Sequence, residues 1–164
     1  MYSKDDFVAT AALLQEIADD LGYGDVFNYN RGRECLQAIE LNFDISSTLS
    51  GADAYSINNE PVEFKSTTQD KIKGTYAGIS VKEDWDDVED YLINEKIGPY
   101  KNHYFARFKG TSIEEIWVMD VSDVLSILLP KCKKSHATRK GKADSRIRAE
   151  ITQREIYSLG TRIK

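Results

Sequence analysis

Two short stretches, GADAY at residues 51–55 and PVEFKS at residues 61–66, are typical of neighbouring strands that carry charge on one face. Side chains alternate between the two faces of a strand, so Glu63 and Lys65 project together while the apolar residues flanking Glu63 face the core. Asp53 joins them if the polar turn between the two stretches folds back and pairs the strands. The pattern therefore predicts a strand, a turn and a second strand, with two carboxylates and one ammonium brought together.

Those three side chains suit metal-assisted hydrolysis of a phosphodiester. Mg²⁺ prefers oxygen ligands and often takes only one or two carboxylates, so Asp53, Glu63 and the backbone carbonyl of Phe64 are the candidate metal ligands. Lys65 would position or polarise the attacking water and offset the charge that builds on the phosphorane. Asp53, Glu63 and Lys65 are thus the candidate catalytic residues. The alternative is an exposed strand with a salt-bridged face.

Further segments along the chain carry a resemblance to a known family. They include LGYGDVF at 21–27, CLQ at 35–37, HYFARFKGTSIEEI at 103–116 and LGTRI at 159–163. With the two strands, they resemble the PvuII-like type II restriction endonucleases of the PD-(D/E)xK nuclease superfamily. The ten-residue spacing from the first acidic residue to the second is the same, and the order is collinear over most of the chain.

This resemblance implies a homodimeric, Mg²⁺-dependent endonuclease that cuts both strands of duplex DNA at a short palindromic site. It implies an α/β (α+β) domain spanning 1–164, with a restriction-endonuclease-like central mixed sheet flanked by helices. About 1–45 would be a helical dimerisation region, about 46–120 the catalytic core and about 130–164 a basic DNA-binding segment. A cognate DNA methyltransferase is an implied partner in the same cell. The alternatives are a structure-specific or repair nuclease, or a non-cleaving DNA-binding protein, on the same fold.

The chain departs from the family where the family reads bases. No run of histidines follows the catalytic lysine; the corresponding stretch, GTYAGISV at 74–81, offers Ser80 instead. The DNA specificity should therefore differ. A base-reading asparagine of the family falls close to Arg148, so Arg146 or Arg148 is predicted to read a guanine or, equally, to contact phosphate.

The net charge of −5 is unevenly distributed. Residues 1–129 carry 11 basic and 24 acidic side chains, hence −13, whereas residues 130–164 carry 11 basic and 3 acidic ones, hence +8. A cationic segment predicts phosphate contacts and salt-sensitive DNA binding, with a solvated basic tail as the alternative. The candidate phosphate contacts are Lys131, Lys133, Lys134, Arg139, Lys140, Lys142, Arg146 and Arg148.

The composition favours one globular domain in the cytoplasm. A chain of 164 residues with 41% hydrophobic content is long enough to bury a core, and no apolar run approaches the ~20 residues that cross a bilayer. The N-terminal residues lack the layout of a signal peptide. Cys35 and Cys132 show no zinc-ligand spacing with the two histidines and are predicted to be reduced and structural.

Hydrophobic periodicity and turn signals predict the secondary structure. Expected helices cover Asp5–Leu21 with Ser3 as the cap, about Arg33–Leu41, Asp86–Glu95 and Ser122–Leu129, the last stopped by Pro130. Expected strands cover Ala52–Ile57, Pro61–Ser66, Gly74–Val81, Tyr104–Lys109 and Ser112–Asp120, followed by a polar basic loop at 131–145 and a strand or extended arm to the end.

The first helix has an apolar stripe, Phe7, Leu14, Ile17 and Leu21. The resemblance implies that this stripe lies partly between two subunits. Periodicity alone does not say which surface it covers, so burial inside the protomer is the alternative.

Overall fold

The computed structural model describes residues 2–48, 50–79, 82–139 and 146–164, which form a mixed α/β fold. The helices are α1 (Lys4–Asp20), α2 (Arg31–Leu41), α3 (Trp85–Tyr91), α4 (Val121–Arg139) and α5 (Gln153–Leu159), with a π-helical turn, η1 (Leu92–Lys96), after α3. The strands are β1 (Asp44–Ile45), β2 (Ala54–Tyr55), β3 (Pro61–Thr67), β4 (Gly74–Ile79), β5 (Asn102–Lys109), β6 (Ser112–Asp120), β7 (Ile147–Ile151) and β8 (Thr161–Arg162). None of the helices in these ranges is both long and apolar enough to cross a membrane.

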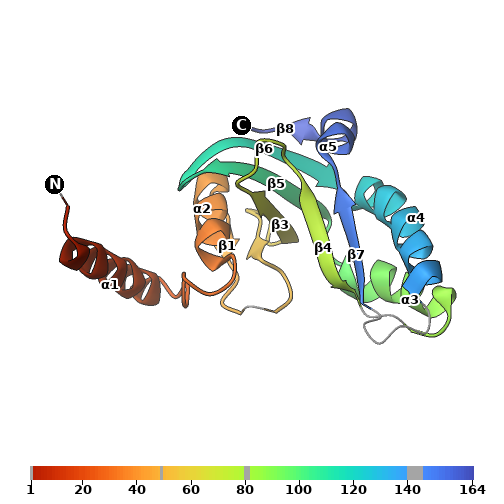
Figure 1. The fold of residues 1–164 in the computed structure, drawn as a ribbon, viewed down its shortest axis with the longest axis horizontal. Helices are drawn as coiled ribbons and strands as arrows, with labels where there is room; N and C mark the ends of the chain where they lie inside the picture. The colour runs from red at the N-terminus through yellow and green to blue at the C-terminus, as the bar shows by residue number, and fades with distance from the viewer. Residues whose placement is uncertain (1, 49, 80–81, 140–145) are drawn as a thin grey trace.

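The strands form a six-stranded mixed sheet in the order β1-β2-β3-β5-β6-β8, while β4 and β7 pair separately as a two-stranded ribbon (Figure 1). Strand β3 lies in the middle of the sheet, antiparallel to β2 and parallel to β5. In the parallel pair Glu63 lies opposite His103 and Lys65 opposite Phe105. The predicted strand, turn and strand are therefore confirmed, and they occupy the centre of the fold.

The sheet buries an apolar cluster on each face. The cluster on the α2 side contains Ala38, Ala54, Val62, Phe64, Tyr104, Ala106, Phe108 and Ile116. The cluster on the other side joins the sheet to α3, α4, α5 and the ribbon through residues that include Phe105, Met119, Leu92, Leu128, Ile147 and Ile156. Val62 and Phe64 are 0% and 5% exposed. Their burial confirms the alternation predicted for β3 and leaves Glu63 and Lys65 on the ribbon side.

The ribbon passes close to the sheet at Gly74, the first residue of β4. A Cβ atom here would lie 2.3 Å from Cε1 of Phe105 and 3.3 Å from Cβ of Lys65, so only glycine permits this approach. The ribbon is antiparallel and pairs Gly74 with Ile151. The predicted strand at 74–81 is confirmed as far as Ile79, and its last two residues lie outside the described ranges.

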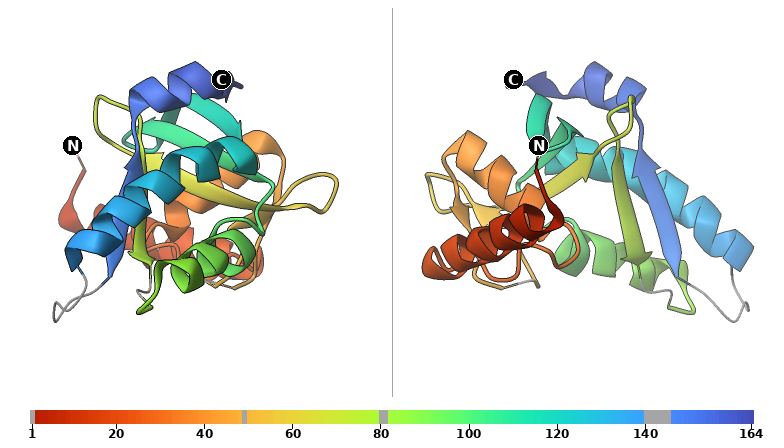
Figure 2. Two further views of the ribbon diagram at one scale, coloured as in Figure 1. Left: turned by 90° about the vertical axis from the view of Figure 1, so that its right-hand side faces the viewer. Right: turned by 60° about the vertical axis from the view of Figure 1, so that its left-hand side comes forward.

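Helix α1 begins as the sequence predicts. The Ser3 hydroxyl accepts a hydrogen bond from the Asp6 N–H (3.1 Å), and the Asp6 carboxylate accepts one from the Ser3 N–H (2.7 Å), which forms a capping box. The helix stands away from the sheet at one end of the molecule (Figures 1 and 2). Only Ala18 of this helix is buried, so burial of its apolar stripe inside the protomer is wrong.

Two predictions near the C-terminus are wrong. Helix α4 does not stop at Pro130 but continues to Arg139, so residues 131–139 are helical rather than a loop. Proline removes one backbone donor, and burial of Cys132 and His136 on this helix offsets that loss. Cys35 and Cys132 are both buried free thiols, as expected.

The predicted C-terminal strand or arm is instead β7, α5 and β8 in succession. Helix α5 starts at a capping box in which the Thr152 N–H donates to the Glu155 carboxylate (2.8 Å). Thr followed three residues later by Glu is a capping-box pattern, so the start of this helix could have been predicted from the sequence.

Candidate active site

A polar pocket of about 200 Å³ opens beside β3 and contains the predicted catalytic side chains. Asp53, Glu63 and Lys65 all line it. The remaining lining residues come from the start of α2, from β3 and from the segment entering β4: Asn30, Glu34, Phe64, Ser66, Thr67, Lys73 and Thr75. The structure therefore brings together the three residues that the sequence singles out.

Backbone hydrogen bonds hold Asp53 in register beside β3. Its N–H donates to the Val62 carbonyl (3.1 Å), and its carbonyl accepts from the Ser46 N–H (3.0 Å). Its carboxylate accepts a hydrogen bond from the Phe64 N–H through Oδ2 (2.7 Å). The side chain is thus fixed against the middle of β3, next to Glu63 and the Phe64 carbonyl.

The Lys65 ammonium lies between two oxygen atoms that are candidate metal ligands. Its Nζ donates to Oε1 of Glu63 and lies 3.3 Å from the carbonyl oxygen of Phe64. The side chains of Lys65 and Glu63 are 17% and 18% exposed, so both are accessible from the pocket but largely shielded from bulk water. One cation therefore already sits where the sequence predicts that a metal would be attracted.

The three carboxyl groups that line the pocket, from Glu34, Asp53 and Glu63, outnumber its two lysines, Lys65 and Lys73. Burial and the adjacent Glu63 raise the pKa of Asp53 to about 7, although Lys65 acts in the opposite direction. A carboxyl that resists ionisation at neutral pH marks a site where a further cation would be favoured.

The raised pKa of Asp53 makes stability depend on pH. The native state binds a proton that the unfolded chain has already released between about pH 4 and pH 7, so the free energy of unfolding should fall as the pH rises through this window. Relative to Asp53→Asn, the metal-free wild type should lose about 1–3 kcal/mol from pH 5 to pH 8 in urea titrations. A constant difference between the two proteins would contradict this assignment.

A control for that measurement is Asp120→Asn. A hydrogen bond from the Ser122 backbone lowers the pKa of Asp120, so its titration lies below pH 5 in both the folded and unfolded states. This variant should leave the slope between pH 5 and pH 8 as in the wild type.

The donor atoms fit Mg²⁺ better than a transition metal. Among the described residues, no three or more His, Cys, Asp or Glu side chains converge as a metal-binding group. The oxygen donors that line this pocket include the carboxylates of Asp53, Glu63 and Glu34 together with the Phe64 carbonyl. Oxygen-only ligands in small number suit Mg²⁺, which keeps waters and substrate oxygens in its remaining positions.

Two charged pocket residues were missed by sequence reasoning. Glu34 lies in the first turn of α2, where burial raises its pKa and Arg31 and Lys65 counteract that rise. Lys73 precedes β4 and pairs with Glu150 of β7 (3.0 Å). No spacing rule connects a helix start or a loop to these strands, so only the tertiary structure reveals their place.

The residues predicted to bind DNA are scattered. Arg148 is exposed on β7, on the same face of that strand as Glu150, which contacts the pocket residues Lys73 and Thr75. Arg146 is exposed just before β7. Neither arginine lines the pocket, and nor do the other described candidates, Lys131, Lys133, Lys134 and Arg139. The remaining candidates, Lys140, Lys142 and Ser80, lie outside the described residues.

Several of these cations are already engaged within the protein; Lys133, for example, lies over the Trp85 ring, with Nζ 5.7 Å from its centroid. Lys131 Nζ donates to the Glu150 carbonyl and to the Glu155 carboxylate, both at 2.7 Å. Arg139 donates from Nη1 to the Arg146 carbonyl. A contact from Lys131 or Arg139 to phosphate would have to compete with these bonds.

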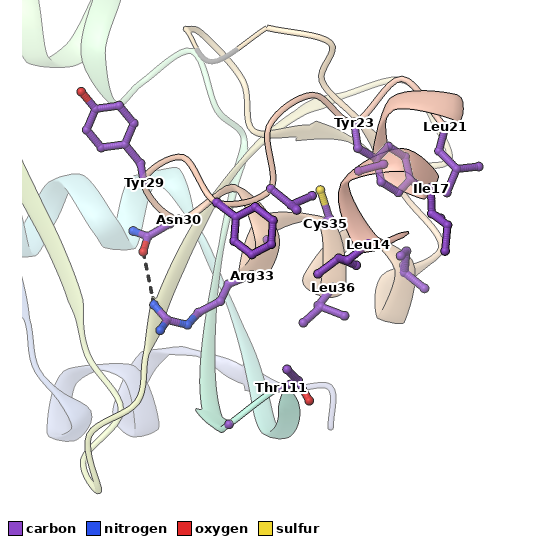
Figure 3. Close-up of a pocket in the computed structure, with 16 residues that line it drawn as sticks. Leu14, Ile17, Leu21, Tyr23, Tyr29, Asn30, Arg33, Cys35, Leu36 and Thr111 are labelled. Carbon is purple, nitrogen blue, oxygen red and sulfur yellow. Dashed lines mark hydrogen bonds between the residues drawn. The ribbon is translucent and has the colours of Figure 1, made fainter. Parts of the chain in front are cut away.

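A second, apolar pocket of about 510 Å³ lies between α1 and α2 (Figure 3). Leu14, Ile17 and Leu21 of α1 and its following turn face Cys35 and Leu36 of α2 across it. Its lining offers apolar surface rather than reactive groups. It is therefore a candidate contact surface, whereas the polar pocket is the candidate site for chemistry.

The chain matches no protein-family model and no curated protein.

Proposed function

We propose that this protein is a type II site-specific deoxyribonuclease with a restriction-endonuclease-like core, related to the PvuII-like enzymes. It would hydrolyse both strands of duplex DNA at a short palindromic site with Mg²⁺. The observation that carries the proposal is the convergence of Asp53, Glu63, Lys65 and the Phe64 carbonyl in one polar pocket at the centre of the sheet.

Each residue has a chemical role in hydrolysis. Asp53, Glu63 and the Phe64 carbonyl would hold Mg²⁺, which when bound supplies a Lewis acid for a phosphate oxygen and lowers the pKa of a water. Lys65 orients the attacking water and offsets the extra negative charge on the phosphorus centre. The water oxygen bonds to phosphorus and releases one proton to solvent, the bond from phosphorus to O3′ breaks with its electron pair on O3′, and O3′ takes up one proton from solvent. The products are a 5′-phosphate and a 3′-hydroxyl.

Cleavage of defined plasmid DNA tests this function. Pure protein with Mg²⁺ should give discrete fragments whose mapped ends share one palindromic sequence, and chelation should stop the reaction. Preference for branched or flapped DNA would favour a structure-specific nuclease. Specific DNA binding without cleavage under these conditions would favour a non-cleaving DNA-binding protein.

A second copy of the chain is the proposed occupant of the apolar surface on α1 and α2. Phe7, Leu14, Ile17 and Leu21 are 76%, 49%, 47% and 57% exposed, which is unusual for a long helix without a partner. The exposed stripe and the apolar pocket lie next to each other on one protomer. In a two-fold symmetric dimer, the stripe of each copy could therefore pack into the pocket of the other. A two-fold dimer matches a palindromic site, since each copy then cuts one strand.

Ile17→Asp should disrupt this dimer. A charge in a buried apolar contact is costly, so the mass in solution should fall from twice 18.6 kDa toward 18.6 kDa in light scattering. Ala12→Asp adds the same charge on the opposite side of α1, outside the apolar pocket, and should leave the dimer intact. A monomeric wild type at micromolar concentration would rule out this interface.

Arg148→Ala should weaken DNA binding by about 1–3 kcal/mol. If affinity falls only for DNA altered at one symmetric pair of base positions, Arg148 reads a base. If affinity falls equally for all sequences, and the slope of log binding constant against log salt concentration decreases by about one, Arg148 contacts a phosphate. Affinities for single-base variants of the site at several salt concentrations decide between them. Arg154→Ala, an exposed arginine of α5, should bind as the wild type does, and unchanged binding by Arg148→Ala would remove it from the interface.

A further inference from the structure

Two buried aromatic side chains lie directly behind Lys65. Tyr76 of β4 is 6% exposed and His103 of β5 is fully buried. A hydrogen bond of 2.9 Å joins Oη of Tyr76 to Nδ1 of His103. The Tyr76 ring in turn faces Lys65, whose Nζ lies 4.8 Å from the ring centroid. The three side chains thus form a continuous contact from the buried layer to the polar pocket.

The fold fixes both members of this pair. His103 lies opposite Glu63 in the parallel β3–β5 register, so it is anchored to the strand that carries the catalytic groups. Tyr76 reaches Lys65 because Gly74, two residues earlier, lets β4 approach Phe105 closely. The Tyr100 and His103 rings meet at an interplanar angle of 81°, with centroids 6.2 Å apart. Both aromatic rings are therefore held by contacts with neighbouring elements of the fold.

The pair is electrically neutral, which suits a lysine neighbour. Burial and the charge of Lys65 lower the pKa of His103 to about 3, against the effect of the Ile97 and Tyr100 carbonyls. Burial raises the pKa of Tyr76, so its hydroxyl keeps its proton. The only cation in this contact is then Lys65, attracted by the negative face of the aromatic ring.

We propose that Tyr76 and His103 are positioning residues for Lys65: the hydrogen bond to His103 locks the Tyr76 ring, and the ring face holds the ammonium at the mouth of the polar pocket. Their catalytic consequence rests on the proposed nuclease function. Glu63 is at once an ion-pair partner of Lys65 and a candidate metal ligand. When a cation takes the Glu63 oxygens, the ring contact is what keeps Lys65 in place for the attacking water.

Lysine NMR on the metal-free protein tests the positioning without any cleavage assay. In protein labelled with ¹³C only at lysine, the Hε protons of Lys65, assigned by their absence in Lys65→Arg, should be shifted upfield by the ring. Tyr76→Leu should abolish the shift, and Tyr76→Phe and His103→Leu should each reduce it because the ring loses its lock. Tyr29→Leu, which removes a ring that is 94% exposed, is the control and should change nothing.

Kinetics test the catalytic consequence separately. Tyr76→Phe should lower kcat about tenfold with DNA affinity unchanged, and combining it with His103→Leu should add little because the two residues act as a unit.

An unshifted Lys65 signal in the wild type, or one that none of the variants moves, overturns the positioning. A wild type that cleaves no DNA overturns the nuclease function and leaves the NMR result valid. Wild-type kcat in both single variants overturns the catalytic role while leaving the nuclease intact.

Discussion

Replacing Glu63 by Gln is expected to lower the rate of DNA cleavage roughly 10³-fold or more, since it removes a charged candidate ligand for Mg²⁺ worth several kcal/mol of transition-state stabilisation. Asp53→Ala should have an effect of the same order for the same reason. Binding to specific DNA should survive or tighten, because one of two carboxylates that face the phosphate is lost. Single-turnover cleavage and DNA affinity, measured on the same preparations, separate these effects.

Glu60→Gln is the matched control for Glu63→Gln. Glu60 lies just before β3 and pairs with Lys101 (2.6 Å) outside the polar pocket, so its loss should leave cleavage near the wild-type rate. Cleavage by Glu63→Gln or Asp53→Ala within tenfold of the wild type at saturating Mg²⁺ would remove that residue from the metal site.

Replacing Lys65 by Ala is expected to lower the cleavage rate by several orders of magnitude, because the water loses its orienting group and the phosphorane loses a positive side chain beside it. Lys65→Arg should not restore the rate. A guanidinium is larger and planar, so it does not reproduce a compact ammonium held between the Glu63 carboxylate and the Tyr76 ring. Both variants should still bind DNA, as measured by equilibrium titration.

Lys71→Ala is the control for a general loss of positive charge. This lysine is exposed in the segment between β3 and β4 and does not line the pocket, so its replacement should have little effect on kcat. Near-full activity in Lys65→Arg would mean that Lys65 acts only as a distant charge, not at the water.

The centre of the fold was readable from the sequence because it depends on a two-residue period. The alternation in PVEFKS specifies which side chains of β3 are buried, and the polar turn before it specifies the antiparallel pairing that brings Asp53 back. The capping pattern at Ser3 likewise placed the start of α1. Patterns of this kind involve residues that are close in the sequence, so they can be recognised without knowing the tertiary structure.

The incorrect or missing predictions concern segments whose structure depends on packing against residues distant in the sequence. A proline ends most helices, but α4 continues past Pro130 because its next turns bury Cys132 and His136 against the rest of the fold. Glu34 and Lys73 reach the pocket from segments that no sequence rule links to β3. No sequence pattern pairs His103 with Tyr76, because their contact depends on the close approach of β4 to the sheet at Gly74.

The pairing of β4 with β7 also determines when the polar pocket can form during synthesis of the protein. Gly74 pairs with Ile151 and Thr75 with Glu150, so among the described strands β4 has no partner until residues 147–151 have emerged from the ribosome. Contacts so distant along the chain close late, because the entropy of a long loop must be overcome first. Lys73 and Thr75 stand at the entrance to this ribbon and line the polar pocket. A nascent chain therefore carries Asp53, Glu63 and Lys65 without a finished pocket around them until β7 has been synthesised.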